Sequence, residues 1–350
     1  MMTLPRAMSL FATGVLFMSA QAQYSGPESV EYDPVGDRYF VSNTSSGAIK
    51  VRDQAGVVTD FATVSPAPYG LEIMGDTLFA CSGGSVKGYR LSDGAQVFNR
   101  NLGGSFCNGI TTDGQYLYVT DFPTAAQRIY KVDVANNSHT TLVTNTGGQP
   151  NGIVWDPIGD RLVVVFWGSN APIKAFDRNT GAATTLVANT GLGSIDGVTI
   201  DCLGNFLVAS WSPDRITRYE PTFTAAGTDL GVPGLNNPAD IDFDHVNNRV
   251  CIPNSGSNTV VLHELDCSTA LAELRRAALL RAVPNPTQGQ LRIEPELLTD
   301  EPYLLLDTKG LLVGGGTLRA RSLLDISQLP AGVYTIFLTR SGHRLQVVRE

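Results

Sequence analysis

Residues 150–166, PNGIVWDPIGDRLVVVF, decide the fold of this 350-residue chain. A short apolar run ends at Asp156, and a longer apolar run follows Arg161. The intervening stretch, Pro-Ile-Gly-Asp, is rich in residues that form tight turns. Two apolar runs joined by such a turn predict an antiparallel β-hairpin.

The same hairpin pattern occurs six times, and successive copies start 39 to 45 residues apart. The copies are PESVEYDPVGDRYFVSN from Pro27, PYGLEIMGDTLFACS from Pro68, CNGITTDGQYLYVTD from Cys107, PNGIVWDPIGDRLVVVF from Pro150, IDGVTIDCLGNFLVAS from Ile195 and PADIDFDHVNNRVCIPN from Pro238. A repeat of about 40 residues is typical of stacked supersecondary units.

Further strand-like runs follow each hairpin, so that a repeat supplies three or four antiparallel strands, which is one propeller blade. We therefore predict an all-β fold, a six-bladed β-propeller spanning residues 23–267. A solenoid of stacked repeats is the alternative. Residues 259–265, TVVLHEL, have no obvious outer strand after them, which predicts a last blade of three full strands. How the first and last blades join to close the ring is not evident from the sequence.

The two ends of the chain differ from the repeats. Residues 1–22 combine Arg6, an apolar stretch and a final Ala-Gln-Ala, the pattern of a cleavable signal peptide. Residues 268–282 are expected to be a linker that contains a helical stretch, ended by prolines and a glycine. Residues 283–350 alternate strand-like runs and turns, which predicts a small C-terminal β-sandwich domain. No stretch of the mature chain is apolar enough over about 18 residues to span a membrane.

Charge and cysteine content restrict the function. The net charge of −8 argues against nucleic acid as a partner, since binding to phosphates needs clustered Lys and Arg. An oxidising compartment allows one or two disulfides among five cysteines and leaves at least one unpaired. We expect most of the cysteines to be buried strand residues. The four histidines have no zinc-site spacing.

One position of the repeat carries most of the oxygen-bearing side chains. This axial slot, the second residue of each copy, contains Glu28, Tyr69, Asn108, Asn151, Asp196 and Ala239. In a propeller the innermost strands start at one mouth of the central channel, so we expect these side chains to converge there. Two carboxylates and two amides suit a hard divalent cation. Alternatively, the Asn and Asp side chains bind the backbone of their own turns.

The slot residues, in the contexts PESVEYDP, CNGI, PNGIVWDP and IDGVTID, resemble those of the senescence-marker-protein (regucalcin)/gluconolactonase family of six-bladed propellers over about residues 24–266. The resemblance implies one divalent metal ion held by Glu28, Asn151 and Asp196, calcium being favoured over magnesium, manganese or zinc. It also implies Asp196 as the catalytic general base and Asn108 as a substrate-binding residue. The implied reaction is the hydrolysis of a sugar lactone or similar cyclic ester. Tyr69 is a candidate for stacking on a substrate ring, with packing as its alternative.

Phe106 departs from this resemblance, since enzymes of the family commonly have an Arg two residues before the Asn of the third blade. The substrate is therefore not carried over. A non-catalytic, NHL-like binding or scaffold propeller is the competing interpretation. The tryptophans of the fourth and fifth repeats, Trp155, Trp167 and Trp211, are expected to pack in the core or at the rim.

The C-terminal region has its own resemblance. Pro284-Asn285-Pro286-Thr287, the turn from Asp307 to Gly310 and residues 325–334, DISQLPAGVY, are similar to the type A sorting domain of the type IX secretion system of Bacteroidetes. This resemblance implies the outer-membrane secretion machinery as a partner. It also implies export across the inner and outer membranes to a secreted or cell-surface location. An ordinary accessory β-domain is the alternative.

Overall fold

The computed structural model describes residues 23–123, 125, 127–267, 280–294, 300–308, 310–319, 322–339 and 343–350. Every regular element in these ranges is a β-strand. No helix within them is long and apolar enough to cross a membrane. The predicted signal peptide, and the predicted helical stretch as far as residue 279, lie outside the described residues.

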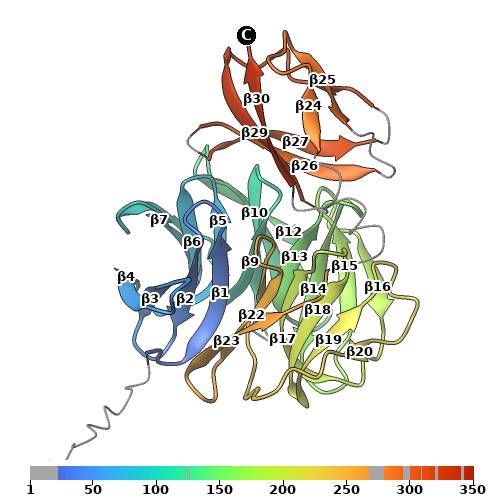
Figure 1. Ribbon diagram of the computed structural model, residues 1–350. Coiled ribbons are helices and arrows are strands. Elements are labelled where there is room, and N and C mark those ends of the chain that lie inside the picture. The colour runs from blue at the N-terminus through green and yellow to red at the C-terminus, as the bar shows by residue number, and fades with distance from the viewer. Residues whose placement is uncertain are drawn as a thin grey trace, which may run out of the picture.

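The all-β prediction is confirmed, and each repeat corresponds to one antiparallel sheet (Figure 1). The strands of the first three sheets are β1 (Pro27–Asp33), β2 (Arg38–Asn43), β3 (Ala48–Asp53), β4 (Val58–Thr63), β5 (Pro68–Met74), β6 (Thr77–Ser82), β7 (Ser85–Arg90), β8 (Gln96–Asn101), β9 (Cys107–Thr112), β10 (Tyr116–Asp121), β11 (Arg128–Asp133) and β12 (Ser138–Val143). The strands of the next three are β13 (Gln149–Asp156), β14 (Arg161–Trp167), β15 (Ile173–Asp177), β16 (Ala183–Val187), β17 (Gly193–Ile200), β18 (Phe206–Ser212), β19 (Asp214–Tyr219), β20 (Thr228–Asp229), β21 (Asp242–Asp244), β22 (Arg249–Asn254) and β23 (Thr259–Glu264). Within the described residues the last of these sheets has three strands and the other five have four.

Burial follows the position of a strand in its sheet. The second strands, such as β6 and β10, are buried on both faces because each sheet lies between two neighbours. The outermost strands, such as β12 and β16, are largely exposed. This difference explains why the second strands read as continuous apolar runs in the sequence.

The ring is closed where the first and last sheets meet. Each innermost strand contacts the next one, and β1 contacts both β21 and β22. Ser29 and Asp240 form a parallel β-bridge, in which Asp240 N donates to Glu28 O at 2.8 Å and Val30 N donates to Asp240 O at 3.2 Å. A solenoid has no such contact between its ends, so the structure excludes that alternative.

Glycines bring the innermost strands close together. A Cβ built on Gly152 would lie 2.6 Å from Asp196 O, and one on Gly197 would lie 2.5 Å from Ile241 N. Gly70 and Gly109 are equally close to the backbone of the following sheet. Only a residue without a side chain permits this approach, so the glycine after the slot residue sets the spacing of the inner strands.

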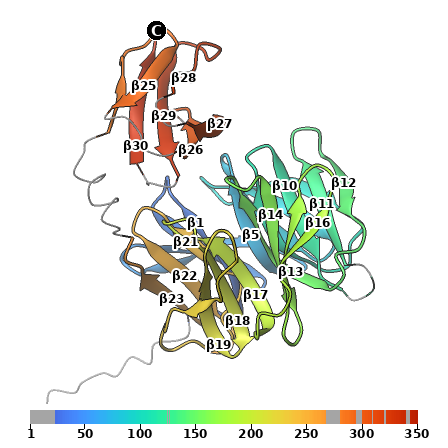
Figure 2. The same cartoon turned by 90° about the vertical axis from the view of Figure 1, so that its right-hand side faces the viewer.

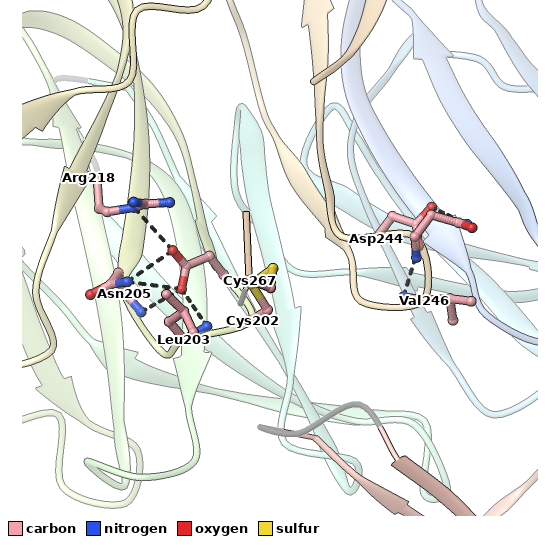
Figure 3. Close-up of a disulfide and its surroundings, with 9 residues drawn as sticks. Cys202, Leu203, Asn205, Arg218, Asp244, Val246 and Cys267 are labelled. Carbon is pink, nitrogen blue, oxygen red and sulfur yellow. Dashed lines mark hydrogen bonds and ion pairs between the residues drawn. A yellow bond between two sulfur atoms is a disulfide. The ribbon is translucent and has the colours of Figure 1, made fainter. Parts of the chain in front are cut away.

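A disulfide holds the end of the three-stranded sheet. Cys202, in the β17–β18 turn, is bonded to Cys267, just after β23 (Figure 3). Cys81, Cys107 and Cys251 are free and buried, in agreement with the sequence analysis.

The recurring turn aspartates organise their own hairpins. Asp156 Oδ1 accepts hydrogen bonds from Ile158 N and Gly159 N, and its Oδ2 pairs with Arg161 Nε at 2.8 Å. Asp201 Oδ1 accepts the corresponding hydrogen bonds from Leu203 N and Asn205 N, two residues that are labelled near the disulfide in Figure 3. The repeated Asp is therefore a structural residue of the turn.

The C-terminal residues form two further sheets. Their strands are β24 (Arg281–Val283), β25 (Gln290–Glu294), β26 (Glu301–Leu306), β27 (Leu312–Leu318), β28 (Leu324–Asp325), β29 (Gly332–Leu338) and β30 (His343–Arg349). One hydrophobic cluster joins both sheets and includes Ala282, Leu291 and Ile336. Because Ala282 belongs to this core, β24 starts within the region expected to be linker.

The C-terminal sheets lie against one side of the propeller (Figures 1 and 2). Arg344 Nη2 donates to Pro34 O at 3.2 Å, and Leu312 lies against Gly114. Pro34 and Gly114 are in the turns that follow innermost strands. These contacts therefore lie at the end of the channel opposite the slot residues, which are at the starts of those strands.

Candidate functional site

The slot residues occupy a bulge in each four-stranded sheet. The register between the first and second strands shifts between Pro27 and Val30 in the first sheet and between Pro150 and Ile153 in the fourth. The second, third and fifth sheets have the same irregularity at this position. A β-bulge interrupts the regular pairing and redirects a side chain. The bulge thus directs the side chain of the slot residue in each of these sheets away from the regular strand pairing.

Hydrogen bonds connect three of these side chains across neighbouring sheets. Asn108 Nδ2 donates to Asn151 Oδ1. Asn151 Nδ2 in turn donates to Asp196 Oδ1 at 3.1 Å and to Ile195 O at 3.3 Å. These hydrogen bonds bring the side chains of Asn108, Asn151 and Asp196 together. Their polar atoms bind across sheets and not within their own turns, which argues against the turn-binding alternative.

Asp240 is a site residue that the sequence analysis missed, because the slot position of the sixth copy is Ala239. Asp240 occupies the next position, where the second to fifth copies have glycine. Its Oδ2 accepts a hydrogen bond from Ser29 Oγ at 2.8 Å. A carboxylate at a position where four of the six copies have glycine was the available signal.

Three carboxylates therefore lie close together at this mouth. Burial, with the charge of Asp240, raises the pKa of Glu28 to about 8. Burial raises the pKa of Asp240 to about 7, and the pKa of Asp196 is raised by burial and by the charges of Glu28 and Asp240. In the part of the chain that the structure describes, no Lys, Arg or His forms an ion pair with them. Burial without a basic partner therefore disfavours the ionised forms of these three carboxyl groups as long as no cation is bound.

A second group of carboxylates lies further along the innermost strands. Burial is the main cause that raises the pKa of Glu31, Glu72 and Asp242, the last to about 6. Glu31 Oε1 accepts from Ile73 N, and Asp242 Oδ2 accepts from Tyr32 N. These contacts tie both side chains to neighbouring inner strands, so buried acidic side chains continue from the mouth along the innermost strands.

Aromatic rings border the mouth on the side of the second to fifth sheets. Tyr69 contacts Phe106 at a centroid distance of 4.6 Å, and Phe106 contacts Phe122 at 5.3 Å. Phe122 contacts Trp167 at 6.0 Å, and Trp167 contacts Trp211 at 5.0 Å. We call these five residues the aromatic arc. All are half-buried, as expected at a rim and not in a core.

The donor set fits a hard cation better than a transition metal. Within the described residues no group of three or more His, Cys, Asp or Glu side chains is arranged to hold a metal ion. The set implied by the resemblance instead combines two carboxylates, Glu28 and Asp196, with the amide oxygen of Asn151. Oxygen-only ligands of this kind suit calcium or magnesium. The observation that favours a cation here is the group of buried carboxyl groups without a basic partner, since a bound cation would favour their ionised forms.

Comparison with known proteins establishes the fold. No protein-family model and no curated protein matches the chain. A putative gluconolactonase is 16% identical over 69% of this chain and 91% of its own, with a TM-score of 0.55. The calcium-binding protein regucalcin from Agrobacterium tumefaciens is 18% identical over 65% of this chain and 81% of its own, with a TM-score of 0.53. A streptogramin B lyase is 18% identical over 70% and 84%, with a TM-score of 0.52. The chain is therefore a β-propeller.

Proposed function

We propose that the mouth lined by Glu28, Asn151 and Asp196 binds one divalent cation, preferably calcium, and hydrolyses a lactone or related cyclic ester. The observation that carries this proposal is the meeting of three carboxylates, from the first, fifth and sixth sheets, without a basic partner among the described residues. A cation would relieve their repulsion, because opposite charge favours the ionised carboxylates.

Each residue has a distinct part in this reaction. Glu28, Asn151 and Asp196 would hold the cation, and Asp196 would also accept a proton from the attacking water. Asn108, which binds Asn151 through its side chain, would orient the substrate or the water. When bound, the cation would supply Lewis-acid polarisation of the ester carbonyl.

Titration calorimetry with calcium chloride tests the cation site. Wild type should bind one calcium ion per chain, and Asp196→Asn should bind it at least about tenfold more weakly, since a charged ligand is lost. Asp229→Asn, on the exposed strand β20, is the control and should bind as wild type does. Equal binding by wild type and Asp196→Asn would contradict the proposed site.

A panel of lactones, assayed with calcium and with a chelator, tests turnover. A hydrolase should lose activity in the chelator and in Asp196→Asn. Calcium binding without hydrolysis would instead support the non-catalytic binding propeller.

We also propose that residues 283–350 act as a type IX sorting module, so that the protein is exported and secreted or held at the cell surface. The support is the order of the sequence motifs around Pro284, Asp307 and Asp325. Fusing residues 280–350, which include all of β24, behind a signal peptide and a fluorescent protein tests this. The fusion should reach the medium or surface in a host with that system and stay in the periplasm when Leu329-Pro330 is replaced by Asp-Asp.

A further inference from the structure

The aromatic arc ends directly beside the proposed cation site. Tyr69 is the slot residue of the second sheet, and Phe106 lies two residues before Asn108. Trp167 is paired in register with Gln149, two residues before Asn151. The arc and the carboxylates therefore lie at the same end of their strands and share the mouth.

Trp211 connects the arc to the carboxylates. Its indole N–H faces Asp196 and lowers the pKa of that side chain. Nε1 is nevertheless buried without a hydrogen-bond partner of normal geometry in the described structure. A buried donor without a partner is unfavourable, so a ligand oxygen that accepts from Nε1 between the ring and the cation site would stabilise this arrangement.

The edge-to-face contacts leave ring surface available at the rim. The interplanar angles along the arc are 77°, 70°, 69° and 78°. In each such contact the edge of one ring meets one face of its neighbour and leaves the opposite face uncovered by that contact, and all five side chains are partly exposed. A flat apolar ligand can stack on such surfaces, whereas an anionic ligand would meet Glu28, Asp196 and Asp240.

We propose that the aromatic arc is the substrate-recognition surface and that the substrate is a neutral lactone or ester with an apolar, preferably aromatic, ring next to the scissile bond. This inference rests on the proposed hydrolytic function and names the substrate class. The ring lies on the arc formed by Phe106, Phe122 and Trp167. The ester group extends towards Asp196 and Trp211 Nε1.

Two lactones that differ only in an aromatic ring provide the test. Dihydrocoumarin is a six-membered lactone fused to benzene, and δ-valerolactone is the same lactone without it. Binding of each is measured by calorimetry on the full chain in chelator, so that neither calcium nor turnover contributes. Wild type should bind dihydrocoumarin at least about tenfold more tightly, since one or two ring contacts contribute about 0.5–1.5 kcal/mol each beyond area burial.

Substitutions that remove a ring but keep apolar volume assign this preference to the arc. Phe106→Leu and Trp167→Leu should reduce the ratio of the two affinities about three- to tenfold, and Trp167→Phe should restore most of it. Phe98→Leu is the matched control, because Phe98 is a half-buried ring on the outer strand β8 that contacts Phe79. Circular dichroism identifies any variant that fails to fold. The test then depends on the ratio of the two affinities in Trp167→Phe compared with that in Trp167→Leu.

The outcomes separate this inference from the proposed function. Equal affinity of wild type for both lactones, or a ratio unchanged in Phe106→Leu and Trp167→Leu, would overturn the assignment of the arc. A clear ring preference without calcium-dependent hydrolysis would support the arc as a binding surface and overturn the hydrolase proposal alone.

Discussion

Ser29 Oγ donates a 2.8 Å hydrogen bond to Asp240 Oδ2 across the seam between the first and last sheets. The same Oγ accepts a hydrogen bond from Leu71 N of the second sheet at 3.1 Å. One hydroxyl therefore connects three of the six repeats at the centre of the ring.

Ser29→Ala should weaken the ring. The substitution leaves Asp240 and Leu71 N each without a partner in a buried setting, so the free energy of unfolding should fall by about 1–3 kcal/mol. Urea denaturation measures this, with Ser138→Ala on the exposed end of β12 as the control. Equal midpoints for wild type and Ser29→Ala would show that the backbone bridge alone closes the ring.

Gly152→Ala should lower the stability of the fold far more than the small size of the added methyl group suggests. The added methyl group would lie 2.6 Å from Asp196 O, a backbone atom of the adjacent sheet that cannot move alone. We expect a loss of about 1–3 kcal/mol from overpacking, together with weaker calcium binding because Asp196 is displaced. Thermal unfolding measures this loss, and Gly314→Ala, with its nearest neighbour atom at 3.7 Å, should have little effect in the same assay.

Reduction of the Cys202–Cys267 disulfide should loosen the three-stranded sheet. The bond closes a loop with a sequence separation of 65, for which loop-closure entropy corresponds to about 4 kcal/mol. Dithiothreitol should lower the unfolding midpoint of wild type towards that of Cys202→Ser/Cys267→Ser. The double variant is its own control, since its midpoint should not respond to the reductant.

His245 should make stability depend on pH in the acidic range. Burial lowers the pKa of His245 to about 4, although the carboxylates of Asp244 and Asp201 act in the opposite direction. Between about pH 6.5 and pH 4 the unfolded chain holds a proton on this side chain that the folded chain does not. The free energy of unfolding should therefore fall by on the order of 3 kcal/mol as pH decreases through this window.

His245→Gln should flatten this part of the profile, measured by urea denaturation at intervals from pH 4 to pH 7. The same substitution at His263, on the outer strand β23, should leave the slope as in wild type. A slope that is unchanged in His245→Gln would assign the pH dependence to other groups.

The sequence predicted the propeller fold well because the hairpin pattern is local. Alternating apolar residues and a turn aspartate such as Asp156 define one hairpin within about fifteen residues. The repetition of this hairpin along the chain then predicts the propeller. Closure was not predictable in the same way, since Ser29 and Asp240 are more than 200 positions apart and nothing within either repeat identifies them as partners.

The candidate site was predictable only where residues kept the register of the repeat. Asn108, Asn151 and Asp196 share one repeat position, and the structure joins them by hydrogen bonds. Asp240 is shifted by one residue from that position. The aromatic arc combines Phe106, just before the innermost strand β9, with Phe122 and Trp211, which lie at the ends of second strands, so no single repeat position contains the whole arc.

The glycine that follows the slot residue has a consequence for how this protein can change. Close backbone contacts of residues such as Gly152 set the spacing of the inner strands, so the backbone of the ring does not depend on which side chain precedes the glycine. Because Asn108, Asn151 and Asp196 are joined by hydrogen bonds, evolution or an engineer would have to exchange them together. The same ring can thereby acquire a new ligand while its architecture persists.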